Sequence, residues 1–133
     1  MDCKTLESFI IPEDSIATEG IKNPNDQIKN NIPIIKSIIS KFIEQIKEKY
    51  KNLQFNCVIK PINNGLSFDV FRDKSVLNEN NEKYKEANRC INSIKRKIEG
   101  LEYHNPKLKV EGYFLCLVED MNNENRIAIC YER

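Results

Sequence analysis

Hydrophobic and polar positions alternate along this chain with two different periods, and these periods predict six elements of secondary structure. Two segments carry apolar residues at steps of three and four, which is the spacing of one helix face. Four shorter segments carry them at every second position, which is the spacing of one strand face. In chain order the pattern predicts helix, strand, strand, helix, strand, strand.

The two helices are expected over residues 30–51 and 81–99. An asparagine N-cap would precede the first helix, and Pro33 would fall in its first turn, where a missing N–H is tolerated. Because its apolar face is mostly isoleucine, a poor helix former, tertiary packing must hold it. Gly100 would close the second helix. The apolar stripe of the second helix is Tyr84, Ala87, Ile91, Ile94, Ile98 and Leu101.

The first strand pair is expected over residues 53–60 and 66–71, joined by a turn at 61–65. That turn ends in Asn-Gly, which tolerates the positive φ of tight hairpins. A half-buried hairpin is therefore predicted in the middle of the chain.

The second strand pair is expected over residues 110–118 and 126–132, joined by a turn-rich segment, and we expect it to form the centre of the sheet. Residues 110–118 are apolar on both faces, so both faces need cover. One face of this strand carries Val110, Phe114, Cys116 and Val118, and the other carries Tyr113, Leu115 and Leu117.

These elements predict an α+β fold, a four-stranded antiparallel sheet with two helices on one face, in the order α-β-β-α-β-β. A single domain is expected over residues 27–133. Residues 1–26 are expected to form an extended N-terminal arm, because a residue before a proline favours extended backbone. The arm contains an apolar island at Phe9, Ile10 and Ile11, closed by Pro12.

Two helices cover only one face of such a sheet, so the second face needs a cover of its own. Either the arm folds over it or a second copy of the chain does, since a large exposed apolar patch marks an interface. We favour a homodimer. The predicted interface residues are Phe9, Ile10, Ile11, Phe71, Tyr113, Leu115 and Leu117.

Composition places the chain among globular proteins, with 133 residues, 40% hydrophobic and 31% charged. A net charge of +1 gives no overall attraction to nucleic acid or membrane. Five widely spaced cysteines without a CxxC pair favour reduced, buried thiols, and no pattern of a signal peptide or membrane span is present. A cytoplasmic protein is therefore expected. The excess of Asn, Ile and Lys is typical of a low-GC bacterium or its phage.

No residue pattern points to catalysis, a cofactor or a metal. Asp69 and Glu111 lie in strand patterns and His104 in a loop, and nothing in their spacing makes them converge. Solvent-facing side chains are the simpler interpretation. A small hydrolase that uses Asp69, Glu111 and His104 is kept as an alternative, and we expect no enzyme.

Basic residues offer two candidate sites for anions. Lys85, Arg89 and Arg96 lie together on the second helix, opposite its apolar stripe, where they form either an ordinary solvated face or a phosphate-binding row. The second candidate lies near the strand ends, where guanidinium groups would suit an anion at a subunit boundary. Its residues are Arg72, Arg126 and Arg133.

The sequence therefore predicts a non-enzymatic small binding protein of the inhibitor, immunity or ligand-sequestering type that acts as a homodimer. Its expected partner is another protein or a small anionic, nucleotide-like ligand held at the subunit boundary. A nucleic-acid-binding protein that uses the basic face of the second helix is the main alternative.

Overall fold

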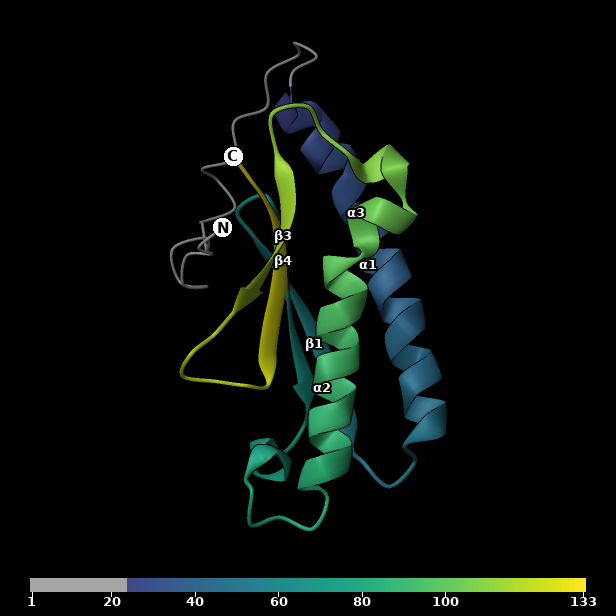
Figure 1. The fold of residues 1–133 in the computed structure, drawn as a ribbon, viewed down its shortest axis with the longest axis vertical. Coiled ribbons are helices and arrows are strands. Elements are labelled where there is room, and N and C mark those ends of the chain that lie inside the picture. Colours follow the sequence, from purple (N-terminus) through teal and green to yellow (C-terminus); the bar gives the residue numbers. More distant parts are fainter. Residues whose placement is uncertain (1–23) are drawn as a thin grey trace.

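The computed structural model describes residues 24–133 as two layers, a four-stranded antiparallel sheet with two long helices over one of its faces (Figure 1). The predicted α+β fold and the order of its main elements are confirmed. The elements are α1 (Pro24–Lys49), β1 (Phe55–Ile62), β2 (Gly65–Phe71), the 3-10 helix η3 (Lys74–Leu77), α2 (Tyr84–Glu99), α3 (Leu101–His104), the 3-10 helix η4 (Pro106–Leu108), β3 (Phe114–Glu119) and β4 (Arg126–Glu132).

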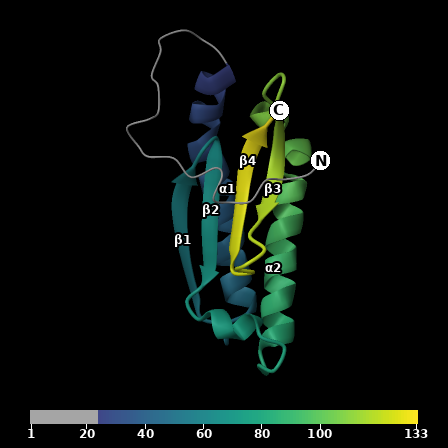
Figure 2. The ribbon, with the colours of Figure 1, turned by 90° about the vertical axis from the view of Figure 1, so that its left-hand side faces the viewer.

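The strands lie in the order β1-β2-β4-β3, so each hairpin contributes one inner strand and one edge strand (Figure 2). The expectation that the second hairpin occupies the centre holds for β4 alone, because β2 pairs with β4 and leaves β3 at the edge. The other edge, β1, carries Pro61 and a register shift between Phe55 and Val58. Both features discourage pairing with a further strand.

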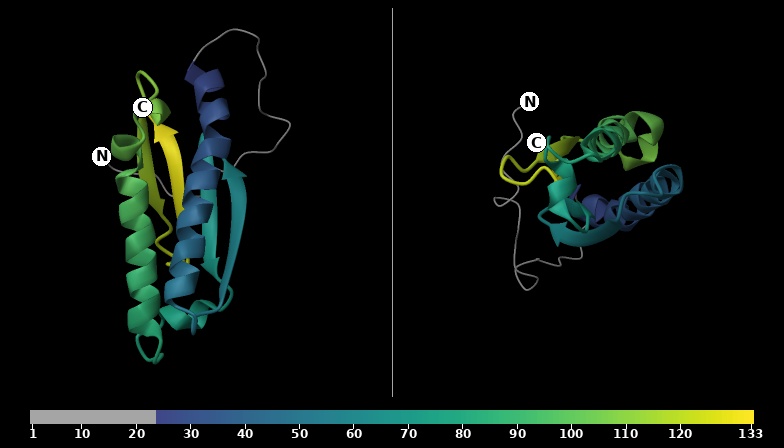
Figure 3. Two further views of the ribbon diagram at one scale, coloured as in Figure 1. Left: turned by 90° about the vertical axis from the view of Figure 1, so that its right-hand side faces the viewer. Right: turned by 90° about the horizontal axis from the view of Figure 1, so that it is seen from below.

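The main core lies between the helices and the sheet, as Figure 3 shows from the helix side. The predicted isoleucine stripes of both helices are buried there, and each fully buried side chain stabilises the fold by about 1.5–3 kcal/mol. Their partners on the sheet are the alternate residues of β2 and β4 that point toward the helices. These partners are Leu66, Phe68, Val70, Ile127, Ile129 and Tyr131.

Helix α1 begins at Pro24, well before the predicted start, and Pro33 lies inside the helix. Tertiary contacts hold the additional turns, although Pro33 cannot donate a backbone hydrogen bond. Ile28 is buried in the main core, and the Asn31 side chain donates a hydrogen bond to the Tyr131 hydroxyl at 3.0 Å. Residues 24–26 therefore belong to the helix and not to an extended arm.

The predicted interface residues Phe9, Ile10 and Ile11 lie outside the described residues, as does the rest of the arm before residue 24.

The turn of the first hairpin is shorter than predicted, because Pro61 and Ile62 belong to β1 and Gly65 to β2. Asn64 supplies the positive φ, at 60°. Gly65 is needed for a different reason: a Cβ at this position would lie 1.9 Å from the carbonyl oxygen of Ile129. The glycine therefore allows β4 to approach β2.

The start of β3 and the conformation of the glycine after α2 also differ from the prediction. β3 begins at Phe114 and not at residue 110, because a turn with Gly112 at φ +84° precedes it and contains Glu111. Helix α2 ends at Glu99 as expected, but Gly100 keeps a negative φ of −90°. The chain therefore continues directly into α3.

Candidate functional site

The face of the sheet that points away from both helices is the first candidate site, and we call it the outer face. In β2, Leu66, Phe68 and Val70 point into the main core, so the residues between them point the other way. Strand pairing extends this assignment to the other three strands. The outer face carries Val58, Lys60 and Ile62 of β1, Ser67 and Asp69 of β2, Arg126, Ala128, Cys130 and Glu132 of β4, and Phe114, Cys116 and Val118 of β3.

The predicted interface residues of β3 lie on the opposite side, and the assignment of faces made from the sequence is wrong. Leu115 pairs with Tyr131 and Leu117 with Ile129, which places both leucines beneath the helices. Both pack against the main core, as does Tyr113. Both faces of β3 are apolar, so only the pairing with β4 distinguishes them.

Phe71, the remaining predicted interface residue, is also part of the main core. It is 3% exposed, and its ring packs on that of Phe55 with 5.0 Å between the ring centroids.

Two exposed apolar side chains lie at diagonally opposite corners of the outer face. Phe114, on the β3 edge beside Glu132, is 56% exposed, and Val58, on the β1 edge beside Asp69, is 39% exposed. Smaller apolar side chains between them form a second buried cluster. Its members are Ile62, Val118, Ala128 and Cys130.

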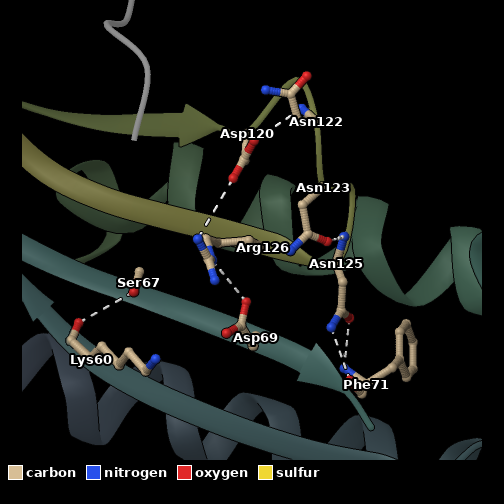
Figure 4. A network of polar contacts seen from close by, with 9 residues as sticks. All are labelled: Lys60, Ser67, Asp69, Phe71, Asp120, Asn122, Asn123, Asn125 and Arg126. Carbon is tan, nitrogen blue, oxygen red and sulfur yellow. Dashed lines mark hydrogen bonds and ion pairs between the residues drawn. The ribbon is translucent and has the colours of Figure 1, made fainter. Parts of the chain in front are cut away.

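A polar network crosses the end of the sheet near the β3–β4 turn (Figure 4). The Arg126 guanidinium lies 3.0 Å from the Asp69 carboxylate and 3.8 Å from the Asp120 carboxylate. Asp120 accepts a hydrogen bond from the backbone N–H of Asn122 at 2.9 Å. Two carboxylates therefore flank the one guanidinium and leave an excess of one negative charge.

Asn125 ties the β3–β4 turn to the end of β2. Its side-chain oxygen accepts from the Phe71 N–H at 2.7 Å, and its side-chain nitrogen donates to the Phe71 carbonyl at 2.9 Å. The residue is buried, and its side-chain amide pairs with the N–H and the C=O of Phe71 as the backbone of a neighbouring strand would. The sequence analysis did not identify this residue, since the only signal is its place in an asparagine-rich turn.

The structure does not bring the three predicted anion-binding arginines together. Arg126 opens β4 and is paired with carboxylates, whereas Arg133 follows the other end of β4 and donates to the Tyr113 hydroxyl at 3.2 Å. Arg72 is exposed after the end of β2. On the helix layer, the other predicted anion-binding residues, Lys85, Arg89 and Arg96, are exposed along α2.

The three residues of the hydrolase alternative do not share a cleft. Asp69 lies at the end of the sheet near the β3–β4 turn, where it pairs with Arg126. His104 and Glu111 are exposed near the other end, in α3 and in the turn before β3 (Figure 1).

The expectation of buried thiols holds for Cys90 and Cys130, whereas Cys57 and Cys116 are half-buried. Burial raises the pKa of Cys57 to about 11 and that of Cys90 to about 12, so both stay protonated near neutral pH. Within residues 24–133, no cluster of three or more His, Cys, Asp or Glu side chains is placed to hold a metal ion.

No family model, curated protein or solved structure matches this chain. None of the helices in the described part is long and apolar enough to cross a lipid bilayer.

Proposed function

We propose that this chain is a non-enzymatic binding protein of the inhibitor, immunity or ligand-sequestering type, and that it acts as a homodimer through its outer face. The observation that carries the proposal is the exposure of Val58 and Phe114 on a face that neither α1 nor α2 covers. An apolar patch at a sheet face marks a contact surface, and Val58 and Phe114 extend the apolar cluster of the outer face to two of its corners.

The positions of these two side chains suit a symmetric contact. In this contact a two-fold axis lies in the plane of the interface and runs along the diagonal of the outer face that does not join Phe114 and Val58. The rotation places Phe114 of each copy over Val58 of the other. The same rotation brings Glu132, next to Phe114, toward Lys60 of the second copy, next to Val58. Apolar and charged groups then match at the same time.

Glu132 supplies a second reason for this arrangement. Its Oε2 atom is buried and accepts no hydrogen bond from the part of the chain that the structure describes. A buried charged group without a partner costs about 1–3 kcal/mol or more. Lys60 is exposed, and the ammonium group of the second copy beside the Glu132 carboxylate would offset part of this cost through charge attraction.

The oligomeric state of the full chain tests the proposal, measured by size-exclusion chromatography with light scattering. We expect a dimer for the unmodified protein and monomers for Val58→Glu and Phe114→Glu. Because both side chains are exposed, these variants should still fold and unfold cooperatively, with a thermal midpoint lowered only by the loss of the dimer contact. Tyr103→Glu is the matched control, because Tyr103 is 84% exposed away from the outer face, and this variant should stay dimeric.

A charge exchange tests the orientation of the two copies. Lys60→Glu should weaken the dimer by repelling Glu132 of the other copy, and Lys60→Glu combined with Glu132→Lys should restore it. An unmodified protein that is monomeric at every concentration would overturn the proposal.

Capture of an anionic ligand at the subunit boundary has less support from the geometry, because Arg126 is already paired and Arg133 lies at the other end of β4. A nucleic-acid-binding function is the second candidate, favoured by the exposure of Lys85, Arg89 and Arg96 on α2. Affinity for DNA or RNA should then fall as salt rises. Replacing Arg89 and Arg96 with alanine should reduce the slope of log affinity against log salt concentration by about one for each phosphate group that α2 no longer neutralises.

A further inference from the structure

A cleft between α2 and the β3–β4 turn lies next to the outer face, with which it shares Arg126, and has an interior volume of about 240 Å³. One wall is the side of α2 that carries Tyr84, Ile91 and Lys95. The other wall is the end of β3 with the following turn, at Glu119, Asp120, Met121 and Glu124. The cleft is large enough for a small organic group.

The charges of the cleft favour a cation. Three carboxylates line it, from Glu119, Asp120 and Glu124, against the cations of Lys95 and Arg126. Both cations are engaged, since Lys95 lies 2.7 Å from the Glu119 carboxylate and Arg126 lies 3.0 Å from that of Asp69. An anion would have to break one of these pairs, whereas a cation meets an excess of negative charge.

Asp120 shows where a ligand would bind. Its side chain is only 5% exposed, yet the ion pair of its Oδ2 atom with Arg126 Nη1 is 3.8 Å long, which is too long for a hydrogen bond. The other oxygen, Oδ1, accepts from the backbone N–H of Asn122. Because Asp120 lines the cleft and a carboxylate has several acceptor positions, it can take a further N–H donor from a ligand.

Apolar groups complete the cleft. Ile91 is buried at its base, and Leu77 and Tyr84 are half-buried beside it. Met121 lies at the surface of the turn with 85% of its area exposed. Its flexible thioether side chain suits contact with ligands of variable shape. The cleft thus offers an apolar wall next to its carboxylates.

The frame of the cleft is held in place before any ligand binds. Asn125 fixes the turn to Phe71 through two hydrogen bonds, and Asn123 accepts a hydrogen bond from the Asn125 N–H at 3.1 Å. Because the carboxylates are carried by an ordered turn, little ordering entropy would be lost on binding.

The geometry points to a binding site for an organic cation, an ammonium or guanidinium group on an apolar stem. The cation would donate a hydrogen bond to Oδ2 of Asp120 and pair with Glu124, while its stem packs on Tyr84 and Ile91. Either a free amine or the basic side chain of a protein partner has this chemistry.

Isothermal titration of the full chain with agmatine tests the site, with inorganic phosphate as the probe of opposite charge. We expect saturable binding of agmatine and none of phosphate. Asp120→Asn should weaken binding about tenfold or more, as expected for loss of a buried charge-assisted contact, and Glu124→Gln about two- to fivefold, as expected for loss of an exposed charge pair. Glu111→Gln, an exposed carboxylate near the other end of the sheet, is the matched control and should bind as the unmodified protein does.

Glu124 is exposed and takes part in no ion pair among residues 24–133, so Glu124→Gln should stay folded even where Asp120→Asn lowers stability. A capped peptide with a single arginine identifies the source of the cation. Binding more than about tenfold tighter than agmatine indicates a protein side chain, and similar affinity indicates a free amine. Absence of saturable agmatine binding, binding of phosphate, or equal affinity in Glu124→Gln would overturn the inference.

Discussion

Replacement of Asn125 with alanine tests the account of how the β3–β4 turn is held. The substitution removes the two hydrogen bonds to the backbone of Phe71, at 2.7 Å and 2.9 Å, and leaves both backbone groups without a partner. Each buried group left unsatisfied costs about 1–3 kcal/mol. Since water from the nearby surface recovers part of this loss, we expect the free energy of unfolding to fall by about 2–4 kcal/mol.

Urea denaturation followed by circular dichroism measures this loss. With a slope of about 2 kcal/mol for each molar unit of urea, in the middle of the range for small proteins, the unfolding midpoint should fall by about 1–2 M. Amide hydrogen exchange at Phe71 should also become faster, because its N–H loses its acceptor. This second measurement reports the specific bond and not only the total stability.

Asn122→Ala is the matched control, since Asn122 lies in the same turn but is exposed. Only its backbone N–H takes part in the network, and alanine keeps that group. Its effect should stay within about 0.5 kcal/mol. Equal midpoints for Asn125→Ala and Asn122→Ala would refute the reasoning.

Three further substitutions or measurements address the core and the thiols. Gly65→Ala should lower the free energy of unfolding by about 3 kcal/mol, because the new Cβ would meet the Ile129 carbonyl oxygen. Gly112→Ala should lower it by only about 1 kcal/mol, because Gly112 has a positive φ but open space around it. Equal urea midpoints for the two variants would contradict this. Alkylation of Cys57 at pH 8 should be about a hundredfold slower in the folded than in the unfolded protein, because the thiol pKa is about 11 in the folded state and 9.0 in the unfolded state. Peptide mapping that shows equal labelling in both states would count against this. Burial raises the pKa of Tyr131 above its unfolded value of 10.0, so the stability that its neutral form contributes is present below pH 10 and is lost as pH rises through the folded pKa. Thermal unfolding across this range should show a steeper loss for the unmodified protein than for Tyr131→Phe, and parallel curves would exclude the effect.

The contrast between the two apolar faces of β3 shows where sequence reasoning stops. Leu115 and Leu117 have the same period as Phe114 and Cys116, shifted by one residue, and both sets are apolar. Periodicity identifies the two faces but not which one the helices cover. That choice follows from the pairing of β3 with β4.

Helix α1 shows the same limit for local signals. The sequence places Pro33 in a first turn, because proline is tolerated there. The structure extends the helix beyond it, since Ile28 packs in the core and Asn31 bonds to Tyr131, and these interactions outweigh the missing backbone bond. A propensity is a weak preference that tertiary packing overrides.

The candidate sites depend even more on interactions between distant parts of the chain. Asp69 and Arg126 appear in the sequence as separate charges, and only the pairing of β2 with β4 turns them into an ion pair. The cleft likewise joins α2 with the end of β3, which share no sequence pattern.

The sequence by itself determined the number, type and order of the main helices and strands, because helix and strand periods are local properties of the chain. The tertiary structure alone decided the strand order, the face of β3 that the helices cover, the role of Asn125 and the cleft beside α2. Each of these depends on which distant segments pair, and pairing follows from the packing of the whole domain.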